Sequence, residues 1–177
     1  MRTAYSVGHS NREPDELLDL LREAGIATLA DVRRVPASRR HPWFARAALD
    51  AALAGAGIRY RWLGEGLGGR RAPMRPVEAS PNAALREEAF RAYADAFDEP
   101  HFQRELGILE QLAADAPTAM LCAERDWRRC HRQLLSDVLV ARGREVIHLV
   151  GPGRRETHQL HEWARVSDGR VTYPALL

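Results

Sequence analysis

The chain has 177 residues, of which 45% are hydrophobic and 28% charged, a composition typical of one soluble globular domain. No apolar run approaches the roughly 20 residues that span a bilayer, and the first residues do not match a secretory signal peptide. The net charge of +2 excludes a chain that is polycationic over its whole length. Because two cysteines occur without a secretory signal, we expect a cytoplasmic protein with no disulfide framework and no membrane partner.

Strands and helices are predicted to alternate along the first half of the chain. Short runs rich in β-branched, aromatic and apolar residues predict strands over residues 3–7, 26–31 and 58–64. Apolar residues at helical spacing predict helices over residues 14–25 and 45–57. Proline, glycine and arginine predict loops over residues 36–44 and 64–76.

The second half continues this alternation and sets the fold class. It predicts strands over residues 118–123 and 145–150 and helices over residues 85–97, 101–114 and 130–143. Asp126 is expected to cap a helix that begins at Trp127. Residues 154–177, the C-terminal extension, are predicted to hold one short surface helix over 156–164 and a last strand, packed on or beside the domain formed by residues 1–153. The pattern predicts an α/β fold, a single layered domain with a mostly parallel sheet of about five strands flanked by helices.

Polar side chains follow the predicted strands at their carboxyl ends, where open α/β sheets bind ligands. The segments that follow the first four strands contain His9, Ser10 and Asn11, then Asp31 and Arg33, then Glu65 and the GLGGRR loop, and finally Cys122 and Glu124. The opposite edge offers mainly Gly, Ala and Pro. This asymmetry predicts one functional edge of the sheet.

Arginine is concentrated in the loops at this edge. All 26 basic residues are Arg, whose planar guanidinium can donate two hydrogen bonds to a phosphate or carboxylate. Residues 31–46 contain five Arg and one acid, and residues 59–75 contain five Arg and Glu65 alone. We expect a basic rim that holds an anion, with an ordinary solvated surface as the alternative. The glycines of GLGGR match neither a dinucleotide-binding nor a Walker pattern.

The segment AMLCAERDWRRCHRQLL, residues 119–135, leaves four interpretations open. The thiols of Cys122 and Cys130 and the ring of His131 can be core groups. A zinc site lacks the usual ligand spacing, and neighbouring helical residues diverge by about 100°, which argues against Cys130 and His131 sharing an ion. Cys130, beside Arg residues at a predicted helix start, is a candidate thiolate. Finally, Asp31 and Glu124 can be the working carboxylates, with His9 as acid or base.

We favour a carboxylate–histidine cluster with an Arg-lined anion site, and with the thiols close behind it. The candidate catalytic residues are His9, Asp31, Cys122, Glu124, Cys130 and His131. The candidate substrate- or anion-binding residues are Ser10, Asn11, Arg33, Ser38, Arg39, Gly68, Gly69, Arg70 and Arg132. No metal ligand is assigned, and the sequence names no cofactor.

Five ordered motifs, VGHSNR, DVRRVPASRR, GIRYRWLGEGLGGRR, FRAYADAF and CAE…CHR, resemble the prokaryotic family called domain of unknown function 488. The likeness runs from about residue 5 to 150. It implies a cytoplasmic α/β domain and the signature positions Gly8, His9, Ser10, Asp31, Arg33, Pro36, Ser38, Gly68, Gly69, Cys122, Glu124, Cys130, His131 and Arg132. The family usually has Lys and Asp-Pro after CAE, whereas this chain has Arg125 and Asp126-Trp127. The resemblance implies no known reaction.

These observations predict an enzyme that acts on an anionic substrate, such as a nucleotide, a nucleic acid or a phosphorylated metabolite. The first alternative is a non-catalytic module that binds nucleic acid or nucleotides, whose affinity would fall steeply with salt. The second alternative is a thiol-redox or metal-binding protein. The sequence defines neither the reaction nor the oligomeric state.

Overall fold

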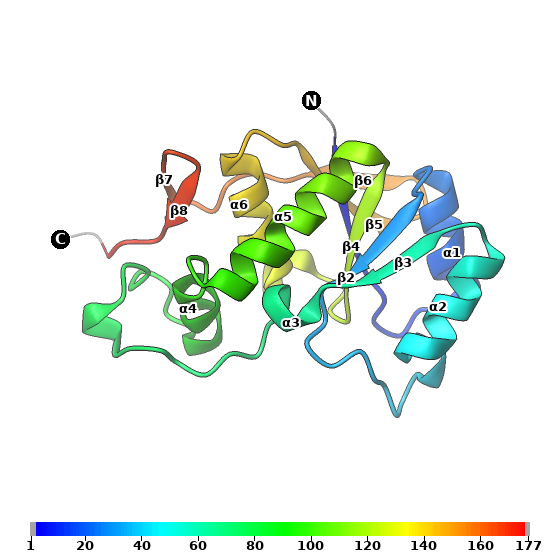
Figure 1. Ribbon diagram of the computed structural model, residues 1–177, viewed down its shortest axis with the longest axis horizontal. Helices are drawn as coiled ribbons and strands as arrows, with labels where there is room; N and C mark the ends of the chain where they lie inside the picture. The colour runs from blue at the N-terminus through cyan, green and yellow to red at the C-terminus, as the bar shows by residue number, and fades with distance from the viewer. Residues whose placement is uncertain (1–2, 176–177) are drawn as a thin grey trace.

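The computed structural model describes residues 3–175, and its centre is a six-stranded sheet with the order β3-β2-β4-β1-β5-β6 (Figure 1). The strands are β1 Ala4–Gly8, β2 Thr28–Asp31, β3 Arg59–Trp62, β4 Thr118–Cys122, β5 Val146–Gly151 and β6 Arg154–Thr157. The first five strands are parallel, and β6 pairs antiparallel with β5 at one edge. The predicted α/β class with a mostly parallel sheet is therefore confirmed, with one strand more than the five expected.

Helices cover both faces of the sheet, as Figure 1 shows for α1 and α2 on one side and α5 and α6 on the other. The helices are α1 Pro14–Glu23, α2 Arg46–Gly55, α3 Gly64–Leu67, α4 Glu88–Asp95, α5 Pro100–Asp115 and α6 Arg132–Ala141, with 3-10 turns η1 Pro42–Phe44, η2 Val77–Ala79 and η3 Trp127–Arg129. Successive side chains of a strand point to opposite faces. Accordingly, Met120 of β4 joins the core under α5 and α6, whereas its neighbours Ala119 and Leu121 join the core under α1 and α2. No helix within residues 3–175 is long and apolar enough to cross a membrane.

The strand order places a crevice between β1 and β4. These two strands are neighbours in register, with Gly8 opposite Cys122. The chain leaves β1 for α1 on one face of the sheet and leaves β4 for α6 on the other face. Adjacent parallel strands whose connections diverge in this way open a gap at their carboxyl ends, which is the usual ligand position in such folds.

One predicted helix start and one predicted loop differ from the structure. Asp126 caps η3 rather than the long helix, because its Oδ1 accepts a hydrogen bond from the backbone N of Arg128 at 3.0 Å, and α6 begins only at Arg132. Cys130 between them has an extended backbone with φ −126° and ψ 149°. The loop predicted over residues 64–76 opens with the short helix α3, Gly64–Leu67.

The prediction of a surface helix over residues 156–164 is also wrong. Residues of this stretch complete β6, and the hairpin of β7, Arg165–Ser167, and β8, Arg170–Thr172, follows. Extended pairing prevails here because the backbone N of His158 continues the ladder to the carbonyl oxygen of Val146 at 2.8 Å. The His158 side chain is buried rather than on the surface.

A buried polar cluster, which we call the tail cluster, joins this last part of the chain to α6 and β5. It consists of Asp137, His148, His158 and Tyr173, all 4% exposed or less. Asp137 accepts hydrogen bonds from His158 Nε2 at 2.8 Å and Tyr173 Oη at 2.6 Å, and His158 Nδ1 lies 3.0 Å from His148 Nε2. Trp127 stacks on His148 with ring centroids 3.9 Å apart. Buried hydrogen bonds therefore hold the segment between β5 and Tyr173 against the rest of the domain.

The tail cluster predicts a pH-dependent stability. Burial, then His158, Arg132 and Arg128, lower the pKa of His148 to about 2. Below about pH 6.5 the unfolded chain takes up a proton at this residue while the folded chain does not, so the free energy of unfolding falls as the pH falls from 6.5 towards 2. The expected slope from this residue is about 1.4 kcal/mol per pH unit.

His148→Phe, which can keep the stacking on Trp127, is expected to remove that part of the slope. Urea unfolding at pH 7.5, 6, 5 and 4 measures the difference in free energy between wild type and variant at each pH. The exposed His101, changed to Gln, is the control and should leave the slope unchanged. Parallel pH profiles for wild type and His148→Phe would contradict the prediction.

Candidate functional site: an arginine-rimmed Cys/His cavity

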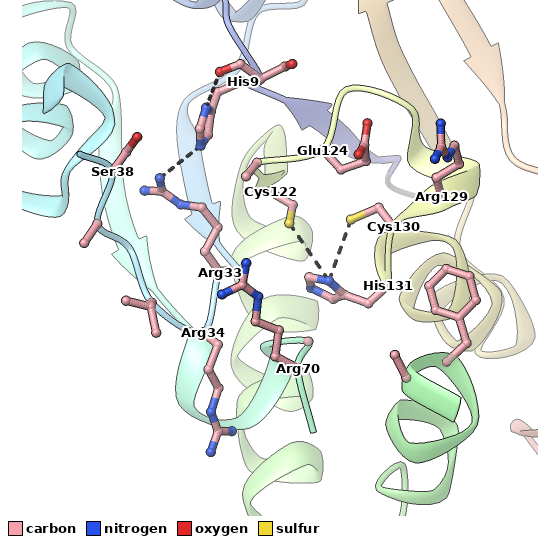
Figure 2. A pocket seen from close by; sticks show the side chains of 17 residues that line it. His9, Arg33, Arg34, Ser38, Arg70, Cys122, Glu124, Arg129, Cys130 and His131 are labelled. Carbon is pink, nitrogen blue, oxygen red and sulfur yellow. Dashed lines mark hydrogen bonds between the residues drawn. The ribbon is translucent and has the colours of Figure 1, made fainter. Parts of the chain in front are cut away.

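A cavity of about 590 Å³ lies where the loops after β1, β2 and β4 meet (Figure 2). Its walls are His9, Ser10, Arg33, Arg34, Val35, Ala37, Ser38, Gly69, Arg70, Ala89, Phe90, Cys122, Ala123, Glu124, Arg129, Cys130 and His131. The structure thus brings side chains as far apart in the chain as His9 and His131 to the sheet edge that the sequence indicated. Of the predicted site residues, Asn11, Asp31, Arg39, Gly68 and Arg132 are not among the cavity walls.

The loops after β1 and β4 are held together by backbone hydrogen bonds beyond the strand ends. The N–H of His9 donates to the carbonyl of Cys122 at 3.0 Å, and that of Ser10 donates to the carbonyl of Ala123 at 2.8 Å. Such close pairing requires Gly8, because a Cβ at this position would lie 1.9 Å from the carbonyl oxygen of Glu124. The glycine therefore permits the approach that forms the floor of the cavity.

Arg33 is a buried wall residue whose guanidinium is largely committed to the protein itself. Its Nε and Nη2 donate to the two carboxylate oxygens of Asp31 at 2.8 and 2.6 Å. Its Nη1 donates to the carbonyl of Phe44 at 2.8 Å and lies 3.1 Å from His9 Nε2. Four of its five N–H groups are thereby used. Asp31, which also accepts from Tyr60 Oη at 2.7 Å, is fully buried outside the cavity and fixes Arg33.

His9 is a neutral imidazole that supports Arg33. Burial, and next the Arg33 charge, lower the pKa of His9 to about 4. Its Nδ1 lies 3.0 Å from the Ser10 carbonyl, which can only accept, so Nδ1 is the protonated nitrogen and Nε2 accepts from Arg33. Both ring nitrogens are engaged in this arrangement. His9 lies in the cavity wall as predicted, yet it has no free nitrogen for a substrate.

Three other arginines are among the cavity walls and have side chains exposed to solvent. Arg34 follows β2, Arg70 follows α3 and Arg129 ends η3, and all three are exposed. Arg34 donates to the Glu65 carbonyl at 3.0 Å, whereas within residues 3–175 the side chains of Arg70 and Arg129 have no hydrogen-bond or ion-pair partner. Arg70 has a left-handed backbone with φ 58°. We call Arg34, Arg70 and Arg129 the rim arginines.

The remaining predicted anion-binding residues occupy different places. Ser38 lines the cavity and its Oγ accepts from the backbone N of His41 at 2.9 Å. Asn11 is exposed, and its side-chain oxygen lies 3.4 Å from Arg125 Nη2. Arg39 is exposed on the loop after Ser38, outside the cavity. Gly68 packs against Arg34, with no space for a Cβ beside it, and Gly69 lines the cavity beside His131.

Cys122, Cys130 and His131 form a compact cluster in the cavity wall, which we call the thiol–imidazole cluster (Figure 2). His131 Nδ1 lies 3.9 Å from Cys122 Sγ and 3.7 Å from Cys130 Sγ. His131 Nε2 lies 3.2 Å from the carbonyl oxygen of Val32. The prediction that Cys130 and His131 diverge is wrong, because Cys130 is extended rather than helical and its sulfur turns back towards the imidazole.

The pKa values of the two thiols are shifted in opposite directions. The interaction between the two sulfur atoms is the main cause: it lowers the pKa of Cys130 well below the ordinary value and raises that of Cys122 well above it. Burial adds to the rise at Cys122, and the charge of Arg132 adds to the lowering at Cys130. The thiolate form is therefore favoured at Cys130 over Cys122.

Arg132 lies behind this cluster and is 1% exposed. Its Nε donates to Cys130 Sγ at 3.4 Å and its Nη1 donates to Ser6 Oγ at 3.0 Å, while Nη2 donates to the carbonyl of Glu124. A buried guanidinium requires a compensating charge, and among these contacts only the sulfur can be anionic. Arg132 thus stabilises the Cys130 thiolate from inside the protein and does not reach the cavity.

Glu124 is the one carboxylate among the cavity walls. It is exposed, and its Oε1 accepts from the backbone N of Asp126 at 3.1 Å. Arg128, which stands at a Cys-x5-Arg spacing from Cys122, pairs with Glu156 at 2.8 Å and lies outside the cavity walls. The loop between Cys122 and Arg128 therefore does not bring that guanidinium to the cavity.

Sequence reasoning missed Arg34, Arg129 and Phe90 as candidate site residues. Arg34 stands beside Arg33 in one of the two Arg-rich loops, and Arg129 stands beside Cys130, so both neighbour candidate residues in the sequence. Phe90 stands at helical spacing with Tyr93 and Phe97, a pattern that predicts a core residue, yet it is half-buried and lines the cavity from α4. Only the packing of α4 against the site could show this.

A comparison with known protein families assigns the chain to one of them. The family described as domain of unknown function DUF488 matches residues 13–139, which include the rim arginines and the thiol–imidazole cluster but not His9 and Ser10. No curated protein and no solved structure matches the chain. Since the match covers well over half of the sequence, the chain belongs to the DUF488 family, as its five motifs had indicated.

Proposed function

We propose that the protein is an enzyme that binds a small anionic substrate, with a phosphate or carboxylate group, in the cavity at the carboxyl ends of the strands. The observation that supports this most is the convergence of the three rim arginines, from three separate loops, on one cavity that also contains Glu124, Cys130 and His131. Perturbed titratable groups in a concave pocket are a common mark of an active site.

The charge and size of the cavity favour an anion of metabolite size. The cavity walls contain three exposed arginines and a single carboxylate, Glu124. Arginine forks bind phosphate and carboxylate with paired, charge-assisted hydrogen bonds. A volume of about 590 Å³ lies in the range of small-molecule sites. The aromatic residues Tyr93, Phe97 and Phe102 are buried and offer no surface on which nucleic-acid bases could stack.

Glu124 is the residue to which we assign acid–base work. It is exposed to the cavity, whereas Asp31 and His9 are bonded to Arg33. A carboxylate at the rim can take a proton from a bound substrate or return one to it. The role proposed for His9 and Asp31 is consequently to hold Arg33 in the wall.

The binding part of the proposal predicts that each rim arginine contributes to anion affinity. Arg34→Gln, Arg70→Gln and Arg129→Gln are each expected to weaken binding by about tenfold, the loss of roughly one charge-assisted hydrogen bond. Calorimetric titration with phosphate, pyrophosphate, a nucleoside monophosphate, a sugar phosphate and a dicarboxylate measures this. Arg61→Gln is the control, because Arg61 is exposed on β3 outside the cavity walls.

Binding that is equal in the rim variants and in the control would contradict the proposal. Once a substrate is identified, Glu124→Gln should retain binding and lose turnover. The non-catalytic alternative predicts instead that oligonucleotides bind, with an affinity that falls steeply with salt, while none of the small anions does.

A further inference from the structure

We infer that Cys122, Cys130 and His131 form a binding site for a divalent, sulfur-preferring cation, for which Zn²⁺ is the best match. This inference goes beyond the proposed function, because it concerns the thiol–imidazole cluster and stands whether or not the rim arginines bind an anion. Two thiolates and an imidazole are ligands that zinc prefers.

The spacing of the three ligand atoms fits one tetrahedral ion. Zinc bonds of about 2.3 Å to sulfur and 2.0–2.1 Å to nitrogen place the ligand atoms of a tetrahedron roughly 3.5–3.8 Å apart. His131 Nδ1 lies 3.7 Å from Cys130 Sγ and 3.9 Å from Cys122 Sγ. All three ligand atoms lie within 4.8 Å of one another. To bind an ion, the two sulfur atoms, which are at most 4.8 Å apart, have to come within about 3.8 Å of each other.

The imidazole is fixed in the tautomer that a metal requires. His131 Nε2 lies 3.2 Å from the carbonyl oxygen of Val32, which can only accept, so Nε2 has the hydrogen. The lone pair of Nδ1 then points to the two sulfur atoms (Figure 2). A ring N–H bonded to a backbone carbonyl is the usual support of a metal-binding histidine.

The surroundings leave space at Nδ1 and support the thiolate. A Cβ on Gly69 would lie 2.8 Å from His131 Nδ1, so the glycine keeps the side of the ligand nitrogen free. Behind the cluster, the buried Arg132 donates from Nε to Cys130 Sγ at 3.4 Å. Hydrogen bonds of this kind orient the ligands of metal sites and tune the charge of the centre.

The three ligands leave one coordination position, and it faces the cavity. All three residues are among the cavity walls. Three protein ligands with an open fourth position are typical of catalytic zinc, whereas structural zinc has four protein ligands. An ion here would be able to polarise a substrate oxygen or a water molecule. The rim arginines would surround the same opening.

Metal titration tests the inference on the full chain. Protein purified under reducing conditions and stripped with a chelator is titrated with Co²⁺, then with Zn²⁺. We expect one Co²⁺ per chain with sulfur-to-metal charge-transfer absorption and the visible bands of a tetrahedral site, and Zn²⁺ should displace it. Cys122→Ser, Cys130→Ser and His131→Gln should each lower the affinity by at least about 100-fold, since even outer residues of metal sites change it by 10–100-fold.

His101→Gln, which alters an exposed histidine, is the matched control and should bind as the wild type does. Circular dichroism shows whether each variant is folded. Thiol labelling of the wild type gives a readout independent of variants: Zn²⁺ should protect both cysteines.

Absence of stoichiometric binding, unchanged affinity in the folded ligand variants, or labelling unaffected by Zn²⁺ would overturn the inference. A disulfide between Cys122 and Cys130 in the isolated, chelator-free protein would do so too, in favour of a redox pair. The proposed function is tested separately, by measuring anion binding to the metal-free protein. A failure of the metal site can therefore be distinguished from a failure of the anion site.

Discussion

Replacement of Asp137 with alanine is expected to lower the free energy of unfolding by about 3–5 kcal/mol, the range for breaking a buried charged network. The carboxylate is fully buried. It accepts from His158 Nε2 at 2.8 Å, from the backbone N of His161 at 3.0 Å and from Tyr173 Oη at 2.6 Å. Alanine leaves these three donors without a partner, and each unsatisfied buried group costs about 1–3 kcal/mol.

Urea unfolding of Asp137→Ala beside wild type measures this loss. The control is Asp50→Ala on the exposed side of α2, where a surface change should stay within about 0.5 kcal/mol. A loss below about 1 kcal/mol for Asp137→Ala would mean that the tail cluster does not hold the last residues in place.

Gly8→Ala is the second large effect that we expect. The added Cβ would lie 1.9 Å from the carbonyl oxygen and 2.7 Å from the carbonyl carbon of Glu124, and 2.8 Å from the Cα of Arg125. These are backbone atoms, so no side-chain rotation relieves the overlap. The loop after β4 has to move, and the bonds from His9 and Ser10 to that loop are lost. We expect a loss of about 3 kcal/mol, at the upper end of overpacking.

Gly107→Ala is the matched control for this change. Gly107 lies in α5, is exposed, and a Cβ there meets no atom within 4 Å. Alanine in a helix interior is favoured over glycine by about 0.5–1 kcal/mol, so this variant should be more stable than wild type. The two glycine variants are thus expected to shift thermal unfolding in opposite directions. A shift of the same sign and size in both would contradict the account of Gly8.

The order of strands and helices in the sheet could be predicted because its local signals agree with the fold. The strand predicted to end near Asp31 and the strand TAMLCA both form where expected. The helix predicted over residues 156–164 was wrong because the decisive contacts are not local. Their polar and apolar residues fit a helix locally, but His158 pairs with the sheet and with Asp137, and no local pattern contains those distant partners.

The location of the candidate site could be predicted from the sequence, but the role of each residue in it could not. Residues that follow parallel strands meet at one edge, so His9, Cys122 and Glu124 could be expected together. The bonds that commit Arg33 to Asp31 and His9 depend on rotamers and on neighbours far away in the chain. The turn of Cys130 towards His131 follows from an extended residue between η3 and α6, and helical periodicity could not reveal it.

The match to the family ends at residue 139, two positions after Asp137. Yet the hydrogen bonds to this carboxylate come from His158, His161 and Tyr173, and β5 and β6 also lie beyond residue 139. A chain shortened to residues 13–139 would lack β1 as well as β5 and β6, so β4 would become an unpaired sheet edge and Asp137 would lose its three hydrogen-bond donors. The smallest fragment that can fold by itself must therefore include the donors to Asp137, and a fragment chosen for expression should extend through Tyr173.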